Sequence, residues 1–216
     1  MSAFPPAVRV ELGGWFLFWA ELDAADVSPV ALASLRRETA DRARATHSLA
    51  RLAEHPTAAA VRRLFRQAGT DPTRYRPSSE ALLRRVLRGE ELPSIHPIVD
   101  LNNCLSVELV VPACVMDVAA LRPPFVLRAG EAGETMISLR GPLDLEGKPL
   151  LADQVGAFGT PITDSERIKV TGGTSRAWLV AYLPRGTLDV SCVAAGLASL
   201  AGAVPGMRVR AAVGRD

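Results

Sequence analysis

The sequence predicts an α+β protein in which an arginine-rich helical front part precedes a back part made mainly of strands. Two observations indicate this class. Apolar residues recur at helical spacing through the front part, whereas beyond Pro112 they come in short runs separated by turns. The 216 residues suffice for one large domain, and a hydrophobic content of 48% argues against global disorder.

The front part is expected to open with one strand and then a helix. The aromatic run at residues 15–19 is typical of a buried strand. Ser28 followed by Pro29 marks a helix start, because serine caps the first turn and proline suits its first position. We expect this helix to run to about Ala53, since the residue before Pro56 avoids helical backbone.

Two further helices are expected before residue 95. The first has a candidate cap at Thr57 and ends at Gly69, whose backbone freedom suits a helix terminus. The second has a candidate cap at Ser78 or Ser79, and Glu80 in its first turn suits the positive end of the helix dipole.

The back part is expected to begin with a fourth helix and to continue as strands. The fourth helix follows Ile98, and a last helix capped by Thr187 precedes the final strand. The expected strands cover residues 125–128, 136–139, 168–171, 178–183 and 207–213.

Charge is unevenly distributed, although the net value is only +2. Residues 27–95 hold thirteen arginines against seven acidic residues, a local net charge of +6. Such a face could meet a phosphate backbone, but a solvated arginine face is the simpler interpretation, because arginine supplies nearly all positive charge in this chain. The candidate RNA contacts are Arg76, Arg84, Arg85 and Arg88.

The three cysteines are an odd number and have no metal-ligand spacing, which favours reduced thiols in a cytoplasmic protein. The longest apolar run near the start is six residues, far short of the roughly 20 that span a bilayer. We therefore expect a cytoplasmic protein with no membrane contact, no metal and no cofactor. Oligomeric state is not indicated by the sequence.

Common enzyme signatures are absent, including a phosphate-binding glycine loop, a GxSxG turn and an HExxH helix. Polar residues instead gather in the back part. Helix capping is the simpler role for Asn102 and Asn103, whereas Asp164, Ser165 and Arg167 fit a structural role and a pocket role equally. The pocket candidates are Asn102, Asn103, Cys114, Glu134, Arg140, Asp153, Asp164, Ser165 and Arg167.

The order and spacing of several short segments resemble the B3/B4 domain of the β subunit of bacterial phenylalanyl-tRNA synthetase. The matching segments are residues 98–103, 111–117, 126–129, 133–134 and 174–183. Free-standing B3/B4 proteins are more similar still, because the resemblance extends to residues 75–86 and to residues 153–167.

The resemblance implies a B3/B4-like domain with a mixed sheet and helices at residues 96–216. Residues 1–95 would form an N-terminal strand and arginine-rich helices packed on it, within one compact unit. In the synthetase this domain hydrolyses tyrosine wrongly attached to phenylalanine tRNA. Cys114 stands where the synthetase has a histidine, and Val180 stands where it has a glutamate, so the tyrosine-specific chemistry does not carry over.

Three functions remain open at this point. The leading hypothesis is a protein that binds aminoacyl-tRNA or an amino-acid-like ligand, with hydrolysis of misacylated tRNA as its activity. The rival is a non-catalytic module that binds RNA, a protein or a metabolite. The third is a metabolic enzyme on the same fold, because fold does not fix function.

Overall fold

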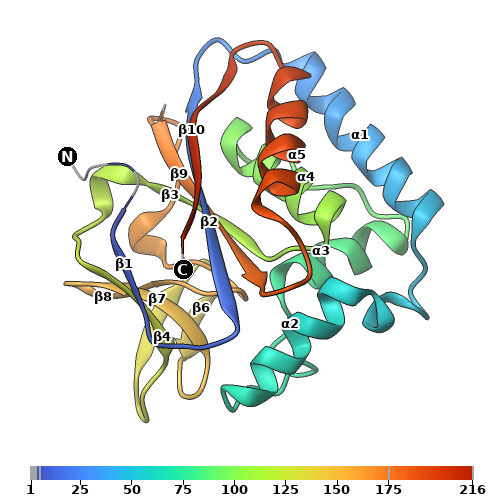
Figure 1. The fold of residues 1–216 in the computed structure, drawn as a ribbon. Coiled ribbons are helices and arrows are strands. Elements are labelled where there is room, and N and C mark those ends of the chain that lie inside the picture. Colours follow the sequence, from blue (N-terminus) through green and yellow to red (C-terminus); the bar gives the residue numbers. More distant parts are fainter. Residues whose placement is uncertain (1–3, 5, 175, 216) are drawn as a thin grey trace.

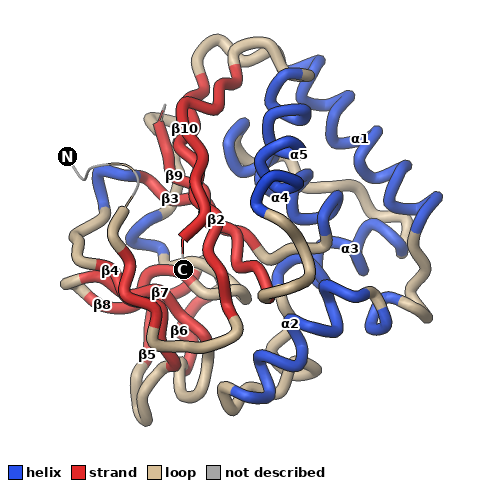
Figure 2. Tube along the Cα trace, in the orientation of Figure 1, coloured by secondary structure: helices blue, strands red, loops and turns tan. Residues whose placement is uncertain are grey.

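The computed structural model describes residue 4, residues 6–174 and residues 176–215. Its centre is a four-stranded antiparallel sheet in the order β10-β2-β9-β3. Helices gather on one side of this sheet, and a second sheet lies on the other (Figures 1 and 2). The central strands are β2 (Trp15–Ala24), β3 (Ala113–Asp117), β9 (Arg176–Pro184) and β10 (Met207–Arg215).

Strand β2 divides its residues between two hydrophobic cores, because successive side chains of a strand point to opposite faces. Phe18, Ala20 and Leu22 belong to the core under the helices. Trp15, Leu17 and Trp19 belong to a second core between the two sheets. We call these two sides of the central sheet the helix side and the inter-sheet side.

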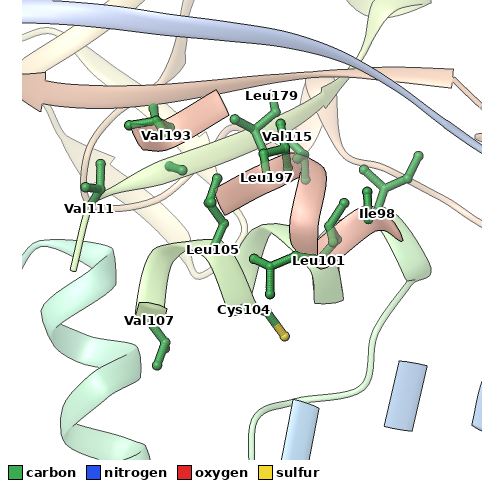
Figure 3. Packing of buried hydrophobic residues seen from close by; sticks show 14 of the residues in the cluster. Ile98, Leu101, Cys104, Leu105, Val107, Val111, Val115, Leu179, Val193 and Leu197 are labelled. Carbon is green, nitrogen blue, oxygen red and sulfur yellow. The ribbon is translucent and has the colours of Figure 1, made fainter. Parts of the chain in front are cut away.

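Helices cover the helix side of the central sheet. They are α1 (Pro29–Thr46), α3 (Ser78–Leu87), α4 (Pro97–Leu109) and α5 (Val190–Gly202). Figure 3 shows Leu101 and Leu105 of α4 and Leu197 of α5 beside Val115 and Leu179 of the sheet. α2 (Pro56–Gln67) instead contributes Val61, Leu64 and Phe65 to the inter-sheet core.

The second sheet is mixed and has the order β1-β4-β7-β8. β1 runs parallel to β4, and the other neighbours are antiparallel. Phe125 and Phe158 of this sheet pack against each other, and Phe125 stacks on Trp19 at a centroid distance of 6.3 Å. The strands are β1 (Val8–Val10), β4 (Phe125–Ala129), β7 (Pro149–Asp153) and β8 (Gly156–Gly159), with a separate hairpin of β5 (Thr135–Ser138) and β6 (Gly141–Asp144).

One buried polar group joins the two inner strands of the central sheet. Glu21 of β2 is buried and accepts hydrogen bonds from Trp178 Nε1 at 3.0 Å and from Arg176 at 2.7 Å. Because both donors lie on β9, this carboxylate ties the two central strands together at a defined register.

The α+β fold class is confirmed, but one expected helix end and one expected strand are wrong. The first helix ends at Thr46 rather than near Ala53, because the Thr-His-Ser run has low helix propensity and the chain turns before a short 3-10 helix (Leu52–Glu54). No strand forms at residues 168–171. Ser165 instead caps a 3-10 helix (Glu166–Ile168), and Thr174 accepts a hydrogen bond from Thr171 N.

Three expected helix caps are also wrong. Thr57 lies inside α2, which begins at Pro56 after His55. Ser78 and Ser79 lie inside α3, which follows Pro77 without a side-chain cap. The hydroxyl of Thr187 donates to Pro184 O, and Asp189 is the residue before α5. No helix of the described residues is long and apolar enough to cross a membrane.

Candidate functional site

A row of three residues crosses the inter-sheet side of the central sheet. In the antiparallel register, Cys114 of β3 is paired with Val180 of β9, and Val180 is paired with Trp19 of β2. All three side chains are buried. Two residues further along β9, Tyr182 points to the same side and is fully buried.

Three polar or sulfur groups meet at the bare backbone of Gly159, where β8 ends. Cys114 Sγ lies 3.9 Å from the Tyr182 hydroxyl. A Cβ atom at Gly159 would lie 3.2 Å from Cys114 Sγ, 3.2 Å from Tyr182 Oη and 3.8 Å from Asp164 Oδ1. The absence of a side chain at this position therefore allows the three groups to approach one another. We call Cys114, Gly159, Asp164 and Tyr182 the Asp164 cluster.

One β-bridge and two backbone hydrogen bonds hold the backbone around Asp164. Gly159 forms a bridge with Asp164, and Ser165 N donates to Phe158 O at 2.9 Å. On the other side, Leu139 N donates to Asp164 O at 2.9 Å. Asp164 thus sits between β8 and the β5–β6 hairpin, with its side chain aimed at the inter-sheet core.

The Asp164 carboxyl is unusual because Oδ1 is buried and has no hydrogen-bond partner among the described residues. Burial raises the pKa of Asp164 to about 7, while the neighbouring Cys114 thiol acts in the opposite direction. At neutral pH the group therefore exists in both protonation states, so that it can accept or release a proton.

The thiol and the phenol of the cluster are both neutral groups. Burial raises the pKa of Cys114 well above its ordinary value, and the nearby Asp164 carboxyl raises it further. Burial, followed by Cys114 and Asp164, raises the pKa of Tyr182 in the same way. Because the thiolate is the nucleophilic form, Cys114 is inert as a nucleophile in this environment.

Aromatic residues form the apolar wall beside the cluster. Trp15 contacts Tyr182 edge-on, with ring centroids 6.3 Å apart. The indole N–H groups of Trp15 and Trp19 are buried and have no acceptor among the described residues. Buried polar groups are normally paired, so two unpaired donors and one unpaired carboxylate oxygen around one core are features of a binding site.

The family model for the B3/4 domain matches residues 60–198, well over half of the chain. The chain belongs to the B3/4 domain family. The matched region begins inside α2, so most of the front helices lie within the domain. Of the helices expected to precede the domain, α1 lies before the matched residues, whereas α3 and most of α2 lie within them; α4 was expected inside the domain and lies within the matched residues.

The B3/4 domain assignment agrees with a fold comparison. The crystal structure of an N-terminal fragment of the phenylalanyl-tRNA synthetase β subunit from Pyrococcus horikoshii is similar, with a TM-score of 0.50 and 13% sequence identity. The match covers 100% of this chain but 56% of that fragment, so the chain spans little more than half of its length. No curated protein matches the chain.

Two other predicted pocket residues of the B3/4 domain pair with each other. Asp153 and Arg167 form a two-pronged ion pair at 2.9 and 3.1 Å, in which the Asp153 side chain is fully buried. Arg167 also donates to Ala120 O at 2.7 Å, and Asp153 accepts from Arg122 N. These contacts join β7 to a 3-10 helix at Val118–Ala120 and to the 3-10 helix at Glu166–Ile168, which is a structural role.

The remaining pocket candidates are spread over the domain. Asn102 donates to Ala113 O at 3.3 Å and, like Asn103, is buried on α4. Glu134 pairs with Arg128 at 2.7 Å, and Ser165 caps a 3-10 helix. Arg140 is exposed at the turn of the β5–β6 hairpin. Of the nine candidates, Cys114 and Asp164 are the pair that meets in the Asp164 cluster.

Sequence reasoning missed Tyr182 and Gly159. Tyr182 lies two residues after Val180, the position at which the resemblance implies a glutamate. Strand alternation alone could therefore have placed Tyr182 on the same face as Val180. Nothing in the sequence marks Gly159, because its role depends on contacts with side chains from β3 and β9. Among the described residues, no group of three or more His, Cys, Asp or Glu side chains could hold a metal ion.

The four predicted RNA contacts differ in their surroundings. Arg76 and Arg84 both lie beside Glu80, whose side chain is buried. Arg85 pairs with Glu90 at 3.0 Å. Arg88 is exposed at the end of α3.

Proposed function

We propose that this B3/4 domain protein binds the aminoacyl group of an aminoacyl-tRNA at the Asp164 cluster and hydrolyses the ester. The observation that supports the proposal is the Asp164 carboxyl beside Cys114, whose Oδ1 is buried without a hydrogen-bond partner among the described residues and whose pKa is raised to about 7 by burial. A carboxyl with this pKa suits general base catalysis at neutral pH.

The proposed reaction uses Asp164 and Tyr182 in different roles. The Asp164 carboxylate takes a proton from a water molecule as the water oxygen attacks the ester carbonyl. The neutral Tyr182 hydroxyl donates a hydrogen bond to the oxyanion that forms. Collapse breaks the bond to the ribose oxygen, and the proton held by Asp164 passes to that oxygen. The products are a free amino acid and an uncharged tRNA.

The apolar residues beside the Asp164 cluster affect which amino-acid side chain the site would accept. Val180 lies in one row with Trp19 and Cys114. The synthetase resemblance implies a glutamate at Val180 and a histidine at Cys114. Valine offers no charge and no hydrogen bond to a phenolic hydroxyl. An amino acid with an apolar side chain therefore fits this wall better than tyrosine.

A deacylation assay tests the proposal. Total tRNA would be charged with one amino acid at a time, and release would be followed with wild-type protein, Asp164→Asn and Cys114→Ala. We expect accelerated release of at least one amino acid, loss of this release in Asp164→Asn, and its retention in Cys114→Ala. Release that depends on Cys114 but not on Asp164 would overturn the assignment.

A non-catalytic binding module is the second candidate, and one observation favours it. Cys114 and Tyr182 are at most 2% exposed and Oδ1 of Asp164 is buried, so these three groups are shielded from solvent in this conformation. A closed site can hold an amino-acid-like ligand without admitting attacking water. A rise in melting temperature with amino-acid esters, together with no release from any charged tRNA, would support this candidate.

A further inference from the structure

We propose that Arg62, Arg76 and Arg84 form a phosphate-binding site on α2 and α3, and that this site holds a backbone phosphate of the RNA that carries the aminoacyl group. The identity of the RNA rests on the proposed function. The arginine cluster itself is independent of it.

The cluster places three guanidinium groups around one carboxylate. Arg62 Nη1 lies 2.9 and 3.1 Å from the two oxygens of Glu80, and Arg84 Nε lies 3.0 Å from Oε1. Arg76 Nε approaches Oε1 at 3.5 Å. Glu80 is only 1% exposed, so the carboxylate is available to these arginines and not to solvent.

The three positive charges of the cluster exceed the single negative charge of Glu80. One guanidinium neutralises one carboxylate, and the first contact of Arg62 is already two-pronged. Two positive charges are left over on side chains that reach solvent, since Arg84 is 25% and Arg76 is 39% exposed. A second anion is the group that would complete the site, and arginine is well suited to phosphate.

Two buried donors at the same place form no hydrogen bond among the described residues. They are Ser78 Oγ and Arg76 Nε, whose contact with Glu80 is an ion pair at 3.5 Å. Arg76 lies in the turn before α3 and Ser78 is the first residue of α3, where Pro77 provides no side-chain cap. The first N–H groups of a helix also carry its positive dipole end, which adds to the attraction for an anion.

The arginine cluster is connected to the Asp164 cluster through one backbone contact. Ser78 N donates to Pro161 O at 2.8 Å. Pro161 lies in the turn between Gly159 and Asp164, both of which belong to the Asp164 cluster. A nucleic acid strand bound at Arg76 would therefore lie beside the loop that carries the proposed catalytic carboxyl.

Arg76→Gln is the variant that tests the site with least damage to the fold, because Arg62 and Arg84 still pair with Glu80. The matched control is Arg88→Gln, which removes the same charge from an exposed position at the other end of α3. Binding of total tRNA would be measured over a series of salt concentrations. We expect Arg76→Gln to weaken binding about tenfold and to lower the salt slope by about one.

Arg88→Gln should change tRNA affinity less than about twofold if the arginine cluster is a site rather than part of a diffuse charge. Equal losses in the two variants, or no tRNA binding by the wild-type protein, would overturn the proposal. Ser78→Ala provides a second test that leaves the charge unchanged, and it should also weaken tRNA binding. Melting temperatures establish that all three variants are folded.

Two further probes separate this proposal from the proposed function. An amino-acid methyl ester has no phosphate, so Arg76→Gln should leave its effect on the melting temperature unchanged. Failure of the wild-type protein to respond to any such ester would count against the Asp164 cluster and not against the arginine cluster. Inorganic phosphate should raise the melting temperature of the wild type and not of Arg76→Gln, and equal responses would contradict the site.

Discussion

Cys114 and Val180 lie directly opposite each other on β3 and β9, in the core between the two sheets. The synthetase resemblance implies a histidine and a glutamate at these two positions. The structure makes them neighbours, so the two replacements change one local environment from polar to apolar. The polar groups that remain nearby are the Asp164 carboxyl and the Tyr182 hydroxyl.

Asp164 should make stability depend on pH. Burial raises its pKa to about 7 from an ordinary value of 3.8, so the folded protein binds a proton that the unfolded chain releases between these values. Stability from this group is fully present below about pH 4 and is lost as pH rises through 7. In thermal melts, the wild type should therefore lose stability relative to Asp164→Asn over this range. Parallel pH profiles of the two proteins would contradict the raised pKa.

Gly159→Ala should fill the space at the Asp164 cluster. The added methyl group would lie 3.2 Å from both Cys114 Sγ and Tyr182 Oη, which is closer than ordinary contact. We expect ligand effects on the melting temperature and any deacylation to be lost, while the protein stays folded. Adding Cys114→Ala should restore part of the response, because it removes one of the crowded atoms. A single variant that retains full ligand response would place the site elsewhere.

The three cysteines should differ sharply in reactivity. Cys192 is exposed, whereas burial raises the pKa of Cys104 to about 12 and that of Cys114 well above its ordinary value. Iodoacetamide treatment of the native protein, followed by mass spectrometry, should therefore modify Cys192 first. Rapid labelling of Cys114 would show that the site opens to solvent and that the thiol is available for chemistry.

Glu80→Gln should destabilise the protein by about 3 kcal/mol or more, since it leaves Arg62, which is only 14% exposed, without its carboxylate. Urea denaturation measures the loss. Arg88→Gln serves as the comparison, and it should change the free energy of unfolding by less than about 0.5 kcal/mol. An unchanged free energy in Glu80→Gln would mean that the arginines around this carboxylate are held by other contacts.

The sequence predicted elements better than it predicted the site. The aromatic run at residues 15–19 identified β2, and Ser28 with Pro29 identified the start of α1, because these signals are local. It placed a strand at residues 168–171, where Ser165 and Thr174 form side-chain bonds that replace strand pairing. The local apolar pattern does not show whether side-chain hydrogen bonds or strand pairing will form at such a segment.

The site could be predicted only in part, because it depends on contacts between distant segments. Cys114 and Asp164 were both candidates, but their meeting at Gly159 depends on how β3, β8 and β9 pack. Asp153 and Arg167 were equally good candidates by residue type. They turned out to pair with each other, which no spacing in the sequence reveals.

The alternation along β2 has a consequence for insertions and deletions. One residue added or removed near Phe18 would shift every later side chain to the opposite side of the sheet. Trp19 would then face the helices, and Glu21 would lose Trp178 and enter an apolar core. A length change in this strand should thus disrupt the apolar wall beside the Asp164 cluster and the core under the helices together, whereas single substitutions on either side affect one of them.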